Sequence, residues 1–293
     1  MGNWKRNHIG NRNSRRTILR GLAALSIMSV AIIFAGSASA DSLLDKIKNG
    51  GTVRIGFSNE PGYAYPGANN EPLGWVNAMT LDLIKKLGNT KVEPIVTEWG
   101  SLIPGLQAGR FDIITGGMFI LPDRCPNVLF AQPIGKIADA LIVRKGNPDN
   151  IHSFQDIRDK GVTLVTGTGY ATINWAKEAG IADDKVMQVA GLAEIAQAVK
   201  AGRAAVGGAD YFGFKEIVAK DTSVELADPY TPWAKPGYPS LAFAPNEQAT
   251  VDAFNAVLKD YMGSDEMMKA VGKYGYTKDN LPGSETTADL CKK

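Results

Sequence analysis

Short apolar segments alternate with amphipathic helical segments along most of the chain. The segments 52–57 and 162–165 are apolar or alternate between apolar and polar positions, as buried strands do. Residues 77–87 and 192–201 instead carry apolar side chains at helical spacing. Strands that alternate with helices favour an α/β fold with mostly parallel sheets. Because the series begins again near Ala138, we expect two similar lobes.

The segment 99–124 (WGSLIPGLQAGRFDIITGGMFILPDR) predicts a short helix, a buried strand and a loop. Ser101 is expected to cap the helix, and Gly109 to end it. Residues 111–115 are short and apolar enough for an interior parallel strand, which the glycines at 116–117 would end. Ligands bind at the carboxyl ends of strands in open α/β sheets. We therefore expect this segment to form one wall of a small-molecule site.

The first 40 residues have the order of a secretory signal peptide. Residues 1–20 hold six basic residues and no acidic one, an apolar run follows at 22–35, and small residues come next. The apolar run is shorter than the ~20 residues of a membrane span. The segment 14–20 (SRRTILR) resembles a twin-arginine signal, and an ordinary Sec signal with a basic head is the alternative. Either signal places the mature protein in the periplasm.

Removal of this segment changes the charge of the chain. The whole chain has 32 basic and 30 acidic residues, and removal of the six basic residues of the signal leaves 26 and 30. The mature chain of 253 residues therefore has a net charge of −4. This balance does not indicate a nucleic-acid-binding surface, so we expect no nucleic-acid partner. The length suffices for two lobes of ordinary size.

Two cysteines and one histidine limit the chemistry of the mature chain. Cys125 and Cys291 form an even pair in a secreted chain, for which one disulfide is the simplest interpretation and two free thiols the alternative. His152 lies in a polar, loop-like segment. A catalytic triad or a metal site that depends on histidine is not expected. We predict no metal, no cofactor and no catalytic residue.

Aromatic and charged residues fall at predicted strand ends or in the loops beyond them. Tyr63, Trp99 and Phe119 can surround a compact ring or a cation, at about 0.5–2 kcal/mol per cation–π contact, and packing in the core is the alternative for each. Arg124 is the candidate for holding a carboxylate with two hydrogen bonds, with a structural salt bridge as the alternative. Glu60 is the candidate for receiving a positively charged nitrogen, with a solvated loop acid as the alternative.

The second half of the chain adds two candidates. Asp210 follows two glycines at a predicted strand end, where its carboxylate can receive an amine. The turn 166–169 (TGTG) opens a predicted helix, so the backbone N–H groups of Thr168 and Gly169 are expected to bind an anion such as a carboxylate. The turn has neither the lysine of a P-loop nor the third glycine of a dinucleotide fingerprint. Both signs of charge among aromatic rings suit a small zwitterion.

The chain resembles the solute-binding proteins of ABC importers, and specifically the bilobal polar amino-acid type, family 3. The motifs that carry the resemblance are IGFSNEP at 55–61, WGSLIPGLQAGRFD at 99–112, PDR at 122–124, FAQP at 130–133 and LIVRKG at 141–146. The resemblance covers essentially all of residues 41–293.

This resemblance implies a periplasmic-binding-protein-like type II fold. Lobe 1 would comprise 41–137 and 233–293, and lobe 2 would comprise 138–232, with hinge segments near 137–140 and 232–241. It also implies a monomer, without a cofactor, that closes around one compact solute and delivers it to a membrane permease.

The motif that ends at Arg124 departs from the usual amino-acid binders. Those proteins have a pattern like S-I-T-P-E-R where this chain has FILPDR at 119–124, so Phe119 replaces a hydroxyl that would meet a carboxylate. Residues 103–110, the Arg124-Cys125 pair and Leu290-Cys291 are similar to the ectoine- and hydroxyectoine-binding proteins. That similarity implies that the pocket is lined by Glu60, Tyr63, Trp99, Phe119 and Arg124.

Asp210 argues for a different ligand within the same family. It matches the acid that receives the α-ammonium group in amino-acid binders. A polar amino acid, an imino acid or a betaine is therefore the alternative to an ectoine. The alternative of another class is a dehydratase-like enzyme on the same fold, in which Glu60 or Asp210 would act as the acid or base.

Overall fold

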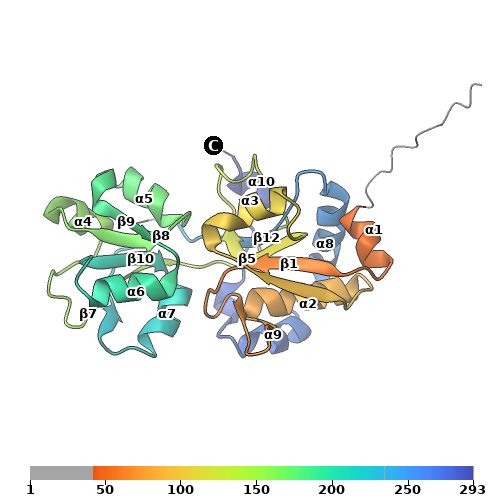
Figure 1. Cartoon of the computed structure of the whole chain (residues 1–293), viewed down its shortest axis with the longest axis horizontal. Helices are drawn as coiled ribbons and strands as arrows, with labels where there is room; N and C mark the ends of the chain where they lie inside the picture. The colour runs from red at the N-terminus through yellow and green to blue at the C-terminus, as the bar shows by residue number, and fades with distance from the viewer. Residues whose placement is uncertain (1–41, 234, 293) are drawn as a thin grey trace, which may run out of the picture. The chain divides into compact units, whose positions relative to one another are not determined.

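The described residues fold around two β-sheets, each the centre of one α/β lobe (Figure 1). The structure is a computed structural model that describes residues 42–233 and 235–292. The signal peptide expected at 1–40 lies outside these residues. Within them, none of the helices has the length and apolar character that crossing a membrane requires. The same residues contain no cluster of side chains suited to a metal ion.

The first sheet has the strand order β4-β1-β5-β12-β6. Strand β1 (Val53–Phe57) pairs in parallel with β4 (Val92–Val96) and β5 (Ile113–Phe119). Strand β12 (Pro239–Phe243) pairs antiparallel with β5 and with β6 (Leu129–Phe130). A hairpin of β2 (Tyr65–Pro66) and β3 (Pro72–Leu73) lies beside this sheet's helices.

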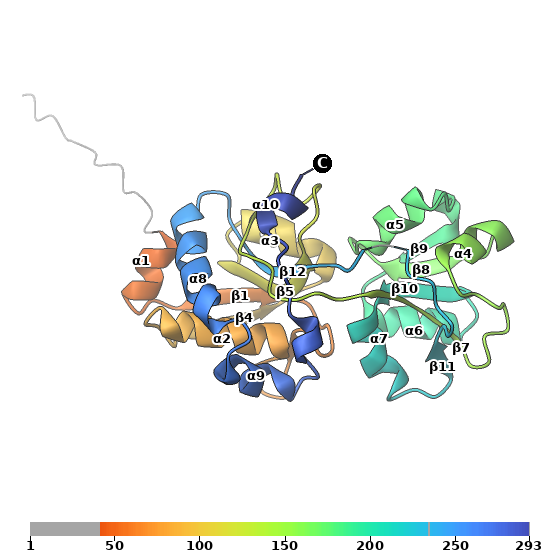
Figure 2. The same cartoon turned by 180° about the vertical axis from the view of Figure 1, so that it is seen from behind.

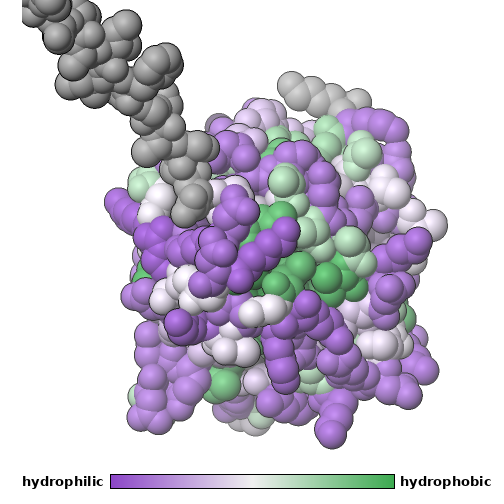
Figure 3. Space-filling model, turned by 90° about the vertical axis from the view of Figure 1, so that its right-hand side faces the viewer, coloured by the Kyte–Doolittle hydropathy of each residue, from purple (hydrophilic) through white to green (hydrophobic). Residues whose placement is uncertain are grey.

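Helices cover both faces of the first sheet. Four of them bury apolar side chains in one core: α1 (Leu43–Lys48), α2 (Trp75–Lys86), α8 (Gln248–Tyr261) and α9 (Asp265–Gly272). On the other face lie α3 (Leu102–Gln107), which the turn η1 (Trp99–Ser101) precedes, and α10 (Thr287–Leu290). The turn η3 (Lys278–Asn280) follows α9. Figure 3 views the end of the lobe that carries α1 and α8 and shows mainly hydrophilic residues around a hydrophobic patch.

The second sheet has the strand order β11-β7-β10-β8-β9. Its strands are β7 (Asp139–Arg144), β8 (Leu164–Gly167), β9 (Val186–Val189), β10 (Val206–Asp210) and β11 (Val224–Leu226). One face carries α6 (Leu192–Lys200) and α7 (Tyr211–Val218), and the other carries α4 (Phe154–Lys160) and α5 (Thr172–Glu178) (Figure 1). The turn η2 (Asp183–Lys185) leads into β9.

The prediction of mostly parallel sheets is wrong for the strands that join the lobes. β7 runs antiparallel to β10 and β11, and β12 runs antiparallel to β5 and β6. Both strands enter their sheet from the other lobe, so no crossover helix constrains them to a parallel direction. The two connecting segments pass side by side (Figure 2), and Ile137 and Gly237 exchange two backbone hydrogen bonds of 2.9 and 2.7 Å.

Local signals decide several helix starts. The hydroxyls of Ser42 and Ser153 accept hydrogen bonds from the backbone N–H groups of Asp45 and Asp156 and so cap α1 and α4. The prediction that Ser101 caps a helix is wrong. Ser101 has a helical backbone within the η1 turn, which continues directly into α3, so its side chain makes no capping bond.

Cys125 and Cys291 form a disulfide, with their Cα atoms 5.8 Å apart. The bond joins the loop after β5 to the end of α10, and both cysteines pack against the core between α3 and the first sheet. It therefore anchors the loop that begins after Phe119 to a segment 166 residues further along the chain.

Candidate solute-binding site

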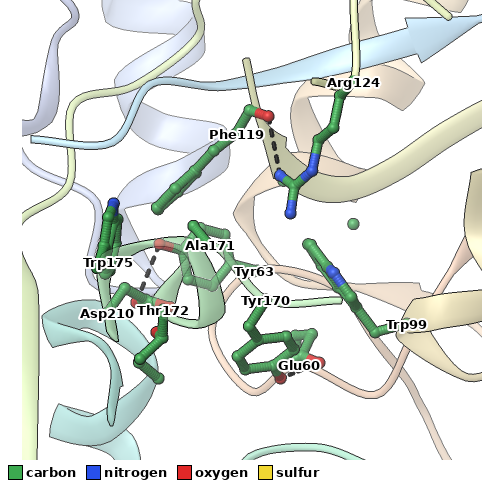
Figure 4. A pocket seen from close by; sticks show the side chains of 13 residues that line it. Glu60, Tyr63, Trp99, Phe119, Arg124, Tyr170, Ala171, Thr172, Trp175 and Asp210 are labelled. Atoms are coloured by element: carbon green, nitrogen blue, oxygen red, sulfur yellow. Dashed lines mark hydrogen bonds between the residues drawn. The ribbon is translucent and has the colours of Figure 1, made fainter. Parts of the chain in front are cut away.

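A cavity between the lobes has a volume of about 420 Å³, its open mouth included. Its lining residues come from both lobes (Figure 4): Glu60, Tyr63, Trp99, Gly116, Gly117, Phe119, Arg124, Tyr170, Ala171, Thr172, Trp175, Ala209 and Asp210. The lining combines aromatic rings with a few charged groups, as small-molecule sites do.

The wall from the first lobe is built on β5. The prediction that residues 116–117 end this strand is wrong, because β5 continues through them to Phe119. A Cβ atom at Gly117 would come within 2.5 Å of the Tyr63 ring, and one at Gly116 within 3.3 Å of the Trp99 ring. Gly117 also has a φ of +75°, which other residues rarely adopt. The two glycines therefore let both rings approach the strand and flank the cavity.

Arg124 is a buried cation whose partners are backbone carbonyls. Its Nη1 donates to the Phe119 oxygen at 2.9 Å, and its Nη2 donates to the Gly169 oxygen, in the second lobe, at 2.8 Å. Burial lowers the pKa of Arg124 to about 10, so the side chain remains charged at neutral pH. Within the described residues no carboxylate forms an ion pair with it, and the structural salt bridge considered from the sequence is not present there. A buried cation in this state favours a ligand carboxylate.

Two carboxylates, the buried Glu60 and the half-buried Asp210, lie on the other side of the cavity from Arg124 (Figure 4). Burial raises the pKa of Glu60 to about 8 and also raises the pKa of Asp210 above its ordinary value. Glu60 is only 5% exposed, so the alternative that it is a solvated acid of a surface loop does not hold. A cation placed beside these groups would favour their ionised forms.

Each carboxylate is held through one of its oxygens. Oε1 of Glu60 accepts hydrogen bonds from the hydroxyls of Tyr170, at 2.6 Å, and Ser58, at 3.2 Å. Oδ1 of Asp210 accepts hydrogen bonds from the Tyr63 hydroxyl, at 3.0 Å, and from the backbone N–H of Gly213, at 2.8 Å. Within the described residues, Oε2 and Oδ2 receive no hydrogen bond from another side chain. The cavity can therefore offer one carboxylate oxygen from each lobe to a ligand.

Comparison with known proteins identifies the family of the chain. Residues 53–277 match the family model of the bacterial extracellular solute-binding proteins, family 3. The chain belongs to this family. A probable amino-acid ABC transporter periplasmic-binding protein of Sinorhizobium fredii, y4tE, is 29% identical to this solute-binding protein and covers 97% of its chain and 99% of its own.

Solved structures of similar proteins include the following two. The crystal structure of EhuB in complex with hydroxyectoine is 32% identical, with a TM-score of 0.77 over 85% of this chain and 97% of its own. The ancestral amino-acid-binding protein AncCDT-1, described as a precursor of cyclohexadienyl dehydratase, is 28% identical, with a TM-score of 0.68 over 80% of this chain and all of its own.

The structure of this solute-binding protein places the predicted site residues in two groups. Six of them line the cavity: Glu60, Tyr63, Trp99, Phe119, Arg124 and Asp210. Thr168 and Gly169 do not line it. The Thr168 N–H donates to the Val189 oxygen at 2.8 Å and extends the pairing of β8 with β9, and α5 begins only at Thr172. The Thr168 N–H group is therefore not free to bind an anion, and the predicted anion site with two free N–H groups does not form.

Gly169 contributes its carbonyl group rather than its N–H group. Its oxygen accepts hydrogen bonds from Arg124 and from the indole N–H of Trp99, the latter at 3.2 Å. Gly169 therefore supports the side chains of Arg124 and Trp99 through a hydrogen-bond acceptor, whereas the sequence predicted a donor.

The sequence analysis missed five lining residues of the second lobe, two alanines (171 and 209) and three larger side chains. Tyr170 directly follows the TGTG turn, and its ring meets that of Trp99 edge-on at 5.4 Å. Thr172 and Trp175 lie one helical turn apart at the start of α5. The Thr172 hydroxyl is buried and has no hydrogen-bond partner among the described residues. The position of α5 immediately after a strand end was the signal that could have identified all three.

Proposed function

We propose that this protein is the periplasmic solute-binding component of an ABC importer and captures ectoine or hydroxyectoine by closure of its lobes. The observation that carries the proposal is the separation of charge across an aromatic-lined cavity, with Arg124 on one side and Glu60 and Asp210 on the other. This arrangement is complementary to a compact zwitterion. The moving parts are taken as lobe 1 (41–137 and 233–293) and lobe 2 (138–232).

The bound solute is proposed to lie with its carboxylate on Arg124 and its cationic group between the two acids. Trp99, Tyr63 and Phe119 would enclose its ring, and the Thr172 hydroxyl would receive a further polar group. The likeness to EhuB, whose structure contains hydroxyectoine, supports an ectoine as the solute.

A polar amino acid or imino acid is the second candidate, and Asp210 favours it. Asp210 lines the cavity, which supports a role in receiving an ammonium group. The name of the Sinorhizobium relative, a probable amino-acid binding protein, also supports this candidate. A betaine fits less well, because a quaternary nitrogen has no N–H group for the carboxylate oxygens.

A thermal-shift screen followed by calorimetry tests the proposal. The solutes are ectoine, hydroxyectoine, glycine betaine, proline and polar amino acids. We expect the largest stabilisation and 1:1 binding with an ectoine. Binding of an amino acid with no response to either ectoine would replace the first candidate by the second.

The alternative of another class is a dehydratase-like enzyme, which the likeness to AncCDT-1 and the raised pKa of Glu60 bring into consideration. Incubation of the purified protein with prephenate-like substrates tests it. Turnover that is lost in Glu60→Gln would establish an enzyme, whereas we expect no turnover.

A further inference from the structure

Two tyrosine–carboxylate pairs cross the cavity in opposite directions. Tyr63 of the first lobe donates to Asp210 of the second at 3.0 Å, and Tyr170 of the second lobe donates to Glu60 of the first at 2.6 Å. Each lobe thus supplies one donor and one acceptor (Figure 4). We propose that Tyr63 and Tyr170 are positioning residues that stabilise lobe closure through the ligand-binding carboxylates themselves. The proposal rests on the solute-binding function and deepens it.

Both tyrosines are firmly held as donors. Burial and the neighbouring carboxylates raise the pKa of each well above its ordinary value, so both hydroxyls stay protonated over the working pH range. The Tyr63 ring packs between Trp75 and Phe212, with ring centres 5.5 and 5.1 Å away, and Phe212 belongs to the opposite lobe. The hydroxyls therefore reach the acids from rings that the surrounding packing has already oriented.

Each tyrosine–carboxylate pair orients its carboxylate and leaves one of the two carboxylate oxygens available to a ligand. Because the tyrosines use Oδ1 of Asp210 and Oε1 of Glu60, the other oxygen of each acid stays free of side-chain donors within the described residues. A ligand cation with two N–H groups can occupy both remaining oxygens while the tyrosines keep the lobes together. Closure and recognition of the cation thus use the same two carboxylates, and breaking one pair weakens both.

Arg124, the third charged side chain of the cavity, also forms a hydrogen bond to the opposite lobe. Arg124, in the first lobe, donates to the Gly169 carbonyl of the second at 2.8 Å. All three charged groups that line the cavity therefore contact the opposite lobe, and the protein contributes its own share of the free energy of closure. Some closed protein should exist before any solute binds.

The test measures closure directly. Single-molecule FRET between dyes on the two lobes would compare the purified wild-type protein with Tyr63→Phe, Tyr170→Phe and the double variant. The net contribution of an ordinary hydrogen bond justifies an expected drop of about three- to tenfold in the closed-to-open ratio for each single variant. Tyr261→Phe is the matched control, since Tyr261 donates to Asp82 within the first lobe at 2.5 Å. It should lower thermal stability and leave the ratio unchanged.

The readouts separate this inference from the identity of the solute. The closed fraction of the solute-free protein does not depend on which solute binds, so a wrong ligand assignment leaves it unaffected. A wild-type protein that is wholly open without solute, or a double variant that closes as well as wild type, would overturn the inference. With any solute that binds, we also expect the double variant to dissociate faster, and a ratio of dissociation rates near one would contradict it.

Discussion

The ring of Phe119 lies directly against the α-carbon of Gly237, so closely that a Cβ atom at Gly237 would overlap the ring. Phe119 ends β5 and lines the cavity, whereas Gly237 belongs to the segment that returns from the second lobe and pairs with Ile137. A wall of the candidate site therefore rests on a connecting segment. Movement of that segment during closure would be transmitted to the ring.

Gly237→Ala should accordingly push the Phe119 ring towards the cavity. We expect affinity for the solute to fall at least tenfold, with a loss of stability of about 1–3 kcal/mol from overpacking. Calorimetry measures the first and chemical denaturation the second. Gly146→Ala serves as a control for an alanine at a glycine with open space around it, although its positive φ will cost some stability. Unchanged affinity in Gly237→Ala would show that Phe119 does not contact the bound solute.

Arg124→Ala should abolish binding. The guanidinium is buried without a carboxylate partner in the described residues, and two charge-assisted hydrogen bonds to a ligand carboxylate are worth about 3–6 kcal/mol. The affinity is therefore expected to fall by more than about 100-fold in calorimetry. Arg158→Ala is the control, because this arginine pairs with Asp159 on the surface of the second lobe. Binding that survives in Arg124→Ala would remove Arg124 from the site.

Glu60 should make stability depend on pH. Its pKa is about 8 in the folded protein, raised from 4.5 mainly by burial, with Asp210 and Glu194 adding repulsion and the hydroxyls of Tyr170 and Ser58 opposing it. The folded state therefore holds the proton more tightly than the unfolded state. The contribution to stability is complete below about pH 4.5 and is lost as the pH rises through about 8.

The difference in unfolding free energy between wild type and Glu60→Gln isolates this contribution. We expect wild type to lose stability relative to Glu60→Gln as the pH rises from 5 to 9, as measured by urea denaturation without solute. A difference that stays constant over this range would show that Glu60 titrates normally.

The buried Thr172 hydroxyl, which has no partner among the described residues, should lower the stability of the solute-free protein. Replacement by Val removes a buried polar group at nearly constant shape, so Thr172→Val is expected to raise the melting temperature. The same variant should weaken binding of a hydroxylated solute about tenfold more than Thr172→Ser, which keeps the hydroxyl. Calorimetry with hydroxyectoine and ectoine compares the two. A destabilised Thr172→Val protein would mean that the hydroxyl has a structural partner.

Loss of the disulfide should affect stability and binding together. The bond closes a loop of 166 residues, and its removal in Cys125→Ser/Cys291→Ser is expected to cost about 2–5 kcal/mol of unfolding free energy. Because Cys125 adjoins Arg124, affinity should also fall. Denaturation and calorimetry on the same preparation separate the two effects. A full loss of stability with unchanged affinity would show that hydrogen bonds alone hold the Arg124 loop.

Features encoded by short stretches of sequence were predictable. The order of strands and helices follows from local periodicity, and the caps at Ser42 and Ser153 follow from their side chains. Phe119 and Arg124 were predicted from their place after a buried strand, and both line the cavity. In each of these examples the neighbouring residues carried the necessary information.

Features that depend on the meeting of distant segments were not predictable in the same way. The direction of β12 depends on its entry from the other lobe. The role of Gly169 depends on whether its turn presents N–H groups or a carbonyl to Arg124. Tyr170 and Trp175 follow the end of β8, which is a local signal, but only the approach of the second lobe to the first brings them to the site. No local pattern specifies that approach.

The place of β12 between β5 and β6 makes the first sheet discontinuous in sequence, whereas the strands of the second sheet all lie within residues 139–226. During synthesis the second sheet can therefore be complete while the first still has an unpaired edge on β5. A fragment of residues 138–232 contains a whole sheet and is the natural piece to express by itself. A fragment that stops before residue 239 would instead expose β5 and is expected to aggregate.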